Sequence, residues 1–266
     1  MTALLPTRMV EKPWGRDSLA KPFTVPAGSR IGEIWFEPDA RLPELLVKYI
    51  FTSAALSVQV HPSDDDLAGQ GKTECWLVVA ADPGARLALG LAEDVTRSRL
   101  RSAAQDGSIE GLLAWYPAKA GDFFYVPAGT IHAIGAGISL VEIQQTSDVT
   151  YRLYDYGRPR ELHLDEALAV ASRCAIAPEL ATRLPEQGSA MLVDEGPFRL
   201  AWAHGELYPA MVDIFDDGGL LLIPRDGSFE IDGEVVPVGS CGVAGSIRAI
   251  GFDPAGACLL AQPRKP

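Results

Sequence analysis

The stretch Gly121-Asp122-Phe123-Phe124-Tyr125-Val126-Pro127-Ala128-Gly129-Thr130-Ile131-His132 decides the fold of this chain of 266 residues. Its aromatic and apolar run at residues 123–126 is typical of a β-strand, and His132 follows shortly after that run. A single histidine in a β domain is more often a structural residue than a functional one. The role of His132 therefore depends on which other side chains the fold brings beside it.

Another strand-like run, at residues 55–60, carries further candidate ligands. Gln59 and His61 are two residues apart, and residues i and i+2 of a strand point to the same face. Glu74 opens a third apolar run, and a buried carboxylate needs a cation or a set of hydrogen bonds. Two histidines, a carboxylate and an amide on adjacent strands predict a metal site inside a β-barrel.

Composition narrows the classes of function. The net charge is −12, which argues against a nucleic-acid or anionic-membrane partner. No stretch approaches the roughly 20 apolar residues of a membrane span, and the N-terminus lacks the pattern of a signal peptide. The four cysteines have no metal-binding spacing and favour a reducing cytoplasm.

Many short strand-like runs, separated by Gly and Pro turns, predict an all-β barrel or sandwich. Helical spacing of Leu100, Ala103 and Ala104 predicts a short helical insertion at about residues 94–115. Residues 174–190 are expected to connect a first domain, residues 1–173, to a second β unit, residues 191–266. In that second unit, residues 207–215 are expected to form a strand, and Asp232-Gly233 predicts a hairpin.

The opening stretch resembles the segment that cupin barrels place before their last metal-binding histidine. The chain is more closely similar to type I mannose-6-phosphate isomerases, and in particular to their short bacterial branch. The resemblance covers about residues 10–170. It is carried, in order and at compatible spacing, by residues 14–15, 31–35, 46–48, 56–62, 71–76, 127–133 and 142–158.

This resemblance implies a cupin jelly-roll barrel followed by a second, degenerate cupin-like unit. It implies a metal-dependent isomerase that interconverts mannose 6-phosphate and fructose 6-phosphate through an enediolate. The implied ligands of one zinc ion per chain are Gln59, His61, Glu74 and His132. Arg152, Lys72 and Asp148 are implied as catalytic residues, and Ser57, Lys72 and Arg158 as the residues that hold the phosphosugar substrate.

Two other functions stay open at this point. A cupin metalloenzyme of another class, such as a dioxygenase, usually presents a His-x-His pair, whereas this chain has Gln59-Val60-His61. A non-catalytic sugar-binding cupin need not retain Glu74, His132 and Arg152 together. The chain also departs from other isomerases at Gly71 and Thr73, where they have His and Pro, and at Ile134, where they have an aromatic residue. No residue is assigned as the proton-transfer base.

Overall fold

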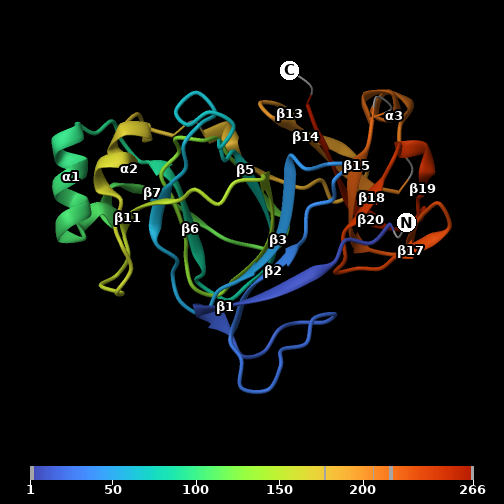
Figure 1. Cartoon of the computed structure of the whole chain (residues 1–266), viewed down its shortest axis with the longest axis horizontal. Coiled ribbons are helices and arrows are strands. Elements are labelled where there is room, and N and C mark those ends of the chain that lie inside the picture. Colours follow the sequence, from blue (N-terminus) through green and yellow to red (C-terminus); the bar gives the residue numbers. More distant parts are fainter. Residues whose placement is uncertain (1–2, 177, 206, 216–217, 265–266) are drawn as a thin grey trace.

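The computed structural model describes residues 3–176, 178–205, 207–215 and 218–264. Antiparallel strands are the predominant regular structure in this part of the chain, and they build two barrels that lie side by side (Figure 1). The all-β prediction is therefore confirmed. None of the described helices has the length and apolar character that crossing a membrane requires.

The first barrel consists of two facing sheets. The larger sheet has the order β1-β2-β3-β10-β5-β8-β12 and the smaller sheet the order β11-β4-β9-β6-β7. The strands of the larger sheet are β1 (Thr7–Arg16), β2 (Ile31–Phe36), β3 (Leu45–Phe51), β5 (Glu74–Ala81), β8 (Asp122–Val126), β10 (Ile138–Gln145) and β12 (Ala181–Arg183). Those of the smaller sheet are β4 (Val58–Val60), β6 (Arg86–Leu91), β7 (Leu113–Pro117), β9 (His132–Ile134) and β11 (Tyr151–Tyr154).

The second barrel follows residue 190. Its sheets have the orders β13-β14-β20-β15-β18 and β17-β16-β19. Its strands are β13 (Ala190–Glu195), β14 (Phe198–His204), β15 (Leu220–Asp226), β16 (Phe229–Ile231), β17 (Glu234–Val236), β18 (Gly242–Ala244), β19 (Ile250–Gly251) and β20 (Ala257–Pro263). Strands β16 and β17 form the hairpin predicted at Asp232-Gly233.

Helices cover the outer face of the smaller sheet of the first barrel (Figure 1). They are α1 (Arg97–Asp106), a 3₁₀ turn at Ser108–Leu112 and α2 (Leu164–Val170). The predicted face of α1, Leu100, Ala103 and Ala104, is buried in one cluster with Val58 and Val60 of β4. Thr96 caps this helix by accepting a hydrogen bond from the backbone N–H of Arg99. The helical insertion is therefore confirmed.

Two local expectations differ from the structure. Residues 207–215 were expected to form a strand, but Pro209–Phe215 is helix α3, which buries Met211 and Phe215. A short apolar run fits either element, and proline at the first helical position favours the helix. Within the expected connector, Ala181–Arg183 pairs with β8 and extends the larger sheet of the first barrel. The division of the chain into domains at residues 174–190 stays a prediction.

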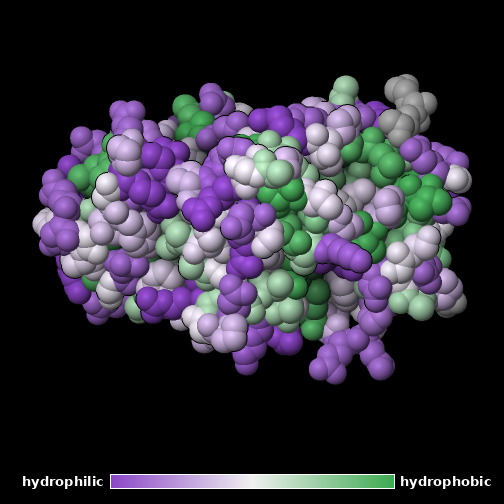
Figure 2. Space-filling view, turned by 90° about the horizontal axis from the view of Figure 1, so that it is seen from below, coloured by the Kyte–Doolittle hydropathy of each residue, from purple (hydrophilic) through white to green (hydrophobic). Residues whose placement is uncertain are grey.

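Strand β3, which lies between β2 and β10 in the larger sheet of the first barrel, is buried along its whole length. Val47, Tyr49 and Phe51 belong to a core shared with the second barrel, whereas Ile50 packs toward the smaller sheet. Seen from below, hydrophilic residues predominate over the first barrel, and hydrophobic residues show mainly on the half that carries the second (Figure 2). The second barrel thus packs against the face of β3 that carries Val47, Tyr49 and Phe51.

Candidate metal centre

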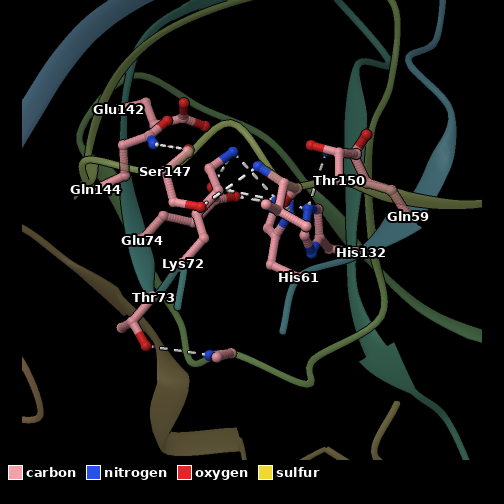
Figure 3. A network of polar contacts seen from close by, with 12 residues as sticks. Gln59, His61, Lys72, Thr73, Glu74, His132, Glu142, Gln144, Ser147 and Thr150 are labelled. Carbon is pink, nitrogen blue, oxygen red and sulfur yellow. Dashed lines mark hydrogen bonds and ion pairs between the residues drawn. The ribbon is translucent and has the colours of Figure 1, made fainter. Parts of the chain in front are cut away.

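Three potential metal ligands converge between the two sheets of the first barrel (Figure 3). His61 follows β4, His132 opens β9 in the same sheet, and Glu74 opens β5 in the facing sheet. The Glu74 carboxylate lies 3.5 Å from Nε2 of His61 through one oxygen and 3.5 Å from Nε2 of His132 through the other. All three side chains are buried, and their ligand atoms lie within 4.8 Å of one another.

Backbone carbonyl groups fix the proton positions of both imidazole rings. His61 donates from Nδ1 to the carbonyl oxygen of Val149 at 2.8 Å, and His132 donates from Nδ1 to that of Thr130 at 2.9 Å. Burial lowers the pKa of His132 to about 4 and that of His61 well below its ordinary value, so both rings are neutral near pH 7. Each Nε2 is therefore an unprotonated lone pair, the form in which histidine binds a metal.

The carboxylate of Glu74 faces these lone pairs, and the ammonium of Lys72 lies 3.3 Å from Nε2 of His61. Burial raises the pKa of Glu74 to about 7, and the charge of Glu142 adds to the effect. In the described part of the chain neither Glu74 oxygen accepts a hydrogen bond, although the Lys72 ammonium lies 3.0 Å from Oε2. Two unprotonated imidazole nitrogens and a buried carboxylate form a donor set that fits a divalent cation.

Gln59 stands beside this cluster. It is directly opposite His132 in the β4–β9 pair, and its Nε2 lies 3.2 Å from His132 Nε2. Its Oε1 accepts a hydrogen bond from the Ser57 hydroxyl at 3.0 Å. A half-turn of the amide would direct the oxygen toward the cluster, and Ser57 could then accept from the amide nitrogen. Gln59 is therefore placed as the sequence predicts, with its nitrogen toward the histidine in this orientation.

A cavity of about 280 Å³ opens beside the cluster. Five cationic side chains line it, and so do five of the predicted site residues: Ser57, Gln59, Lys72, Asp148 and Arg152. The cationic residues are Lys12, Lys48, Lys72, Arg152 and Arg160. The exposed residue Asp148 contributes to the rim. A larger hollow of about 1020 Å³ borders both barrels. The three converging ligands line neither space, but Gln59 and Lys72, which contact them, line the smaller one.

A buried ion pair in the same cavity was not predicted as part of the site. Lys48 of β3 and Glu142 of β10 are cross-strand neighbours, with Nζ and Oε1 3.5 Å apart. Lys48 also donates to Oε1 of Gln144 at 2.7 Å, and Trp76 donates to Glu142 at 3.1 Å. The available signal was a lone lysine within the otherwise apolar run at residues 45–51.

The charges of this network shift one another's pKa values, and they favour the ionised forms of Glu142 and Lys72. Burial alone would raise the pKa of Glu142, but Lys72 and Lys48 outweigh it, so its pKa lies below the ordinary value. Burial alone would lower the pKa of Lys72, but Glu74 and Glu142 outweigh it, so its pKa is raised. The pKa of Lys48 is lowered by burial and by the charge of Lys72. Lys72 thus remains a cation between the metal centre and the cavity.

The predicted arginines have different surroundings. Arg152 is the cross-strand neighbour of Gln59 on β11 and lines the cavity; burial and the nearby charge of Arg160 lower its pKa. Arg158 lies outside the residues that line the cavity, because its guanidinium donates to the backbone oxygens of Ala55 and Asp155. The structure therefore brings Arg152 to the cavity and does not bring Arg158 there.

No family model matches the chain. It is 36% identical over 259 residues to mannose-6-phosphate isomerase ManA of Bacillus subtilis, a match that covers 77% of this chain and 79% of the relative. A probable mannose-6-phosphate isomerase of the same organism is 37% identical over 185 residues, with 63% and 58% covered. Mannose-6-phosphate isomerase of Streptococcus mutans is 46% identical over 136 residues, with 47% and 43% covered. The chain thus spans about half the length of the last two relatives.

Solved structures share the fold. A mannose 6-phosphate isomerase of Bacillus subtilis has a TM-score of 0.75 at 22% identity, with 97% of this chain and 98% of that chain covered. A mannose 6-phosphate isomerase in a zinc-bound form has a TM-score of 0.75 at 13% identity, with 98% and 99% covered. The likeness extends over both barrels, and the fold is the predicted cupin fold.

Proposed function

Since the chain belongs to the mannose-6-phosphate isomerase family, we propose that it interconverts mannose 6-phosphate and fructose 6-phosphate through an enediolate. One observation carries the proposal. The cluster of His61, Glu74 and His132 is contacted by Gln59 and Lys72, and these two residues line a polar cavity that Arg152 also lines. An aldose–ketose isomerase needs such a combination, because negative charge develops on neighbouring substrate oxygens while a proton moves between two carbons.

The proposed cofactor is one zinc ion per chain. His61, Glu74 and His132 would hold it, with Gln59 as a fourth ligand after its amide has turned. Two imidazole nitrogens and a carboxylate suit zinc, and a similar solved structure is a zinc-bound isomerase. When bound, the ion supplies positive charge beside the substrate oxygens.

The proposed roles of the other residues follow from their places in the cavity. Arg152 stabilises negative charge that develops on the substrate, since it is half-buried and stands across from Gln59. The ammonium of Lys72 donates toward the same oxygens from the opposite sheet. Ser57 orients the Gln59 amide and offers its hydroxyl for a hydrogen bond with the substrate. Asp148, at the rim of the cavity, accepts a hydrogen bond from a substrate hydroxyl.

The proposed location is the cytoplasm. All four cysteines are free, and Cys75, Cys241 and Cys258 are buried. Burial raises the pKa of each of these three thiols, so they stay protonated and unreactive. Free, widely separated cysteines support a reducing compartment.

An assay of the purified protein tests the proposed function. We expect mannose 6-phosphate to be converted to fructose 6-phosphate, the activity to be lost with a chelator, and zinc to restore it. A dioxygenase would instead consume oxygen with an organic substrate, and a sugar-binding module would bind the sugar without converting it. Failure of the zinc-loaded protein to interconvert the two sugars would overturn the proposal.

A further inference from the structure

Two arginines on the loop after β11 share one buried carboxylate, that of Asp155, which is 2% exposed. Arg160 donates from Nε and Nη2 to the two oxygens of Asp155 at 2.5 and 2.6 Å. Arg158 lies 3.0 Å from one of these oxygens through Nη2, which also donates to the carbonyl oxygen of Ala55 at 2.7 Å. Asp155 thus fixes both guanidinium groups, in different directions.

The two arginines differ in what remains available to a ligand. A guanidinium has five N–H donors, and Asp155 accepts two of those of Arg160. The remaining three belong to a side chain that lines the cavity and is 29% exposed. Arg158 instead uses its donors on backbone oxygens and on Asp155, and its guanidinium lies 5.4 Å from the ring centroid of Tyr156. Only Arg160 of this pair faces the substrate cavity.

The charge balance of the cavity favours an anionic ligand. Four of the five lining cations have a carboxylate within 4 Å: Lys12 with Glu33, Lys48 with Glu142, Lys72 with Glu74, and Arg160 with Asp155. Arg152 has no carboxylate at that distance in the described part of the chain, and its buried Nε lacks a hydrogen-bond partner there. Arg158 and Arg160 share the single charge of Asp155, so these two arginines and the unpaired Arg152 together exceed the negative charge of that carboxylate.

The order of residues along the wall places the two ends of a substrate. His132, Gln59 and Arg152 are successive neighbours across β9, β4 and β11, so Arg152 stands next to the metal centre. Arg160 comes from the loop beyond β11. We propose that Arg160, positioned by Asp155, binds the phosphate group of the substrate, while Arg152 acts at the reacting carbons. This inference rests on the proposed function, and it transfers to Arg160 the role that sequence resemblance suggests for Arg158.

Two alanine variants form a matched test, because each removes one guanidinium that contacts Asp155 from the same loop. We expect Arg160→Ala to raise KM for mannose 6-phosphate by ~10- to 10²-fold and to change kcat by less than ~3-fold, the pattern of lost uniform binding. Inorganic phosphate should inhibit this variant more weakly by the same factor. The turnover of free mannose should not change. Arg158→Ala should leave KM and phosphate inhibition within ~3-fold of wild type.

Phosphate affinity measured by calorimetry separates this inference from the proposed function. A wild-type protein that does not convert mannose 6-phosphate overturns the proposed function, whereas phosphate binding still tests Arg160. Equal phosphate affinity in Arg160→Ala and wild type, or weakening only in Arg158→Ala, overturns the inference. If Arg160→Ala does not fold, Arg160→Lys serves instead. It keeps the charge but not both bonds to Asp155, so we expect at least ~5-fold weaker phosphate binding, and unchanged binding would refute the assignment.

Discussion

The two barrels of this chain have the same type of architecture, but their interiors differ in chemistry. In the described residues, every buried polar or charged side chain except Gln262 lies between Glu33 and Asp155, in the first barrel. The second barrel buries apolar residues, among them Met211, Phe215 and Leu222. Buried charges oppose folding unless they are paired, whereas apolar burial stabilises it. The interior of the first barrel therefore carries the candidate site, and the apolar core of the second barrel contributes mainly to stability.

The larger sheet of the first barrel connects these two roles. Along β3, Val47 and Tyr49 join the core shared with the second barrel, whereas Lys48 between them lines the cavity. The second barrel thus stabilises a wall whose other face carries charged groups. This difference predicts that substitutions in the first barrel mainly change catalysis and that core substitutions in the second mainly change stability.

Removal of the metal should have the largest effect on catalysis, because it eliminates the metal centre that the polar interior of the first barrel is proposed to hold. We expect chelation, or His61→Ala, to lower kcat by at least ~10³-fold, since a metal ion contributes several kcal/mol of charge stabilisation. Elemental analysis and turnover measure the two losses together. His204→Ala, in the second barrel, is the control and should change neither. Full activity in a demonstrably metal-free protein would contradict the prediction.

Truncation of the second core should give the next largest effect, and in stability only. Leu222 is fully buried in the second barrel. We expect Leu222→Ala to lower the free energy of unfolding by about 2–5 kcal/mol, because it removes buried methyl groups and leaves a cavity. Denaturant titration measures this loss, and kcat per folded molecule should not change.

Val235→Ala, at a position that is 51% exposed in the same barrel, is the control for Leu222→Ala. It should change the free energy of unfolding by less than about 0.5 kcal/mol. A large loss of kcat in folded Leu222→Ala would show that the second barrel takes part in catalysis.

Arg152→Ala should have a smaller effect, and one on chemistry only. Removal of one charge-stabilising donor is expected to lower kcat by ~10²-fold, which corresponds to about 2.7 kcal/mol. Bound metal and the melting temperature should match wild type, because the Arg152 guanidinium has no carboxylate within ion-pair distance in the described residues. Normal turnover with a raised KM would instead assign Arg152 to substrate binding alone.

The sequence predicted the barrel and its metal centre because both depend on local patterns. Strand periodicity places Gln59 and His61 on one face, and Glu74 opens a strand as expected, whereas His132 itself begins β9. The two arginines of the 155–163 loop could not be distinguished in this way. Their directions depend on Asp155 and on the carbonyl oxygen of Ala55, which is distant in the chain. Helix α3 was missed because a short apolar run does not distinguish a strand from a helix.

The ion pair of Lys48 and Glu142 was missed for a different reason. Lys48 interrupts an apolar run, which suggests burial, but its partner lies 94 positions away on β10. Sequence alone indicates that such a lysine needs a buried partner without showing which carboxylate provides it. Replacing this pair with uncharged residues would make the interior of the first barrel more like the apolar interior of the second.

Replacing both members of this pair should have only a small effect on stability, although replacing one should not. In the metal-free protein, the ionised forms of Lys48, Lys72, Glu74 and Glu142 carry charges that sum to zero. Lys48→Met alone leaves one net negative charge buried and should lower the free energy of unfolding by about 3–5 kcal/mol. Lys48→Met combined with Glu142→Gln restores the balance and keeps an acceptor for the Trp76 indole. We expect the double variant to be within about 1 kcal/mol of wild type, since an apolar replacement of a buried pair is often neutral. Denaturant titration of both variants measures the coupling. Equal losses in the two would show that Lys48 stabilises the barrel by packing and by its bond to Gln144 rather than by charge, and the polar interior would then carry no electrostatic penalty relative to the apolar one.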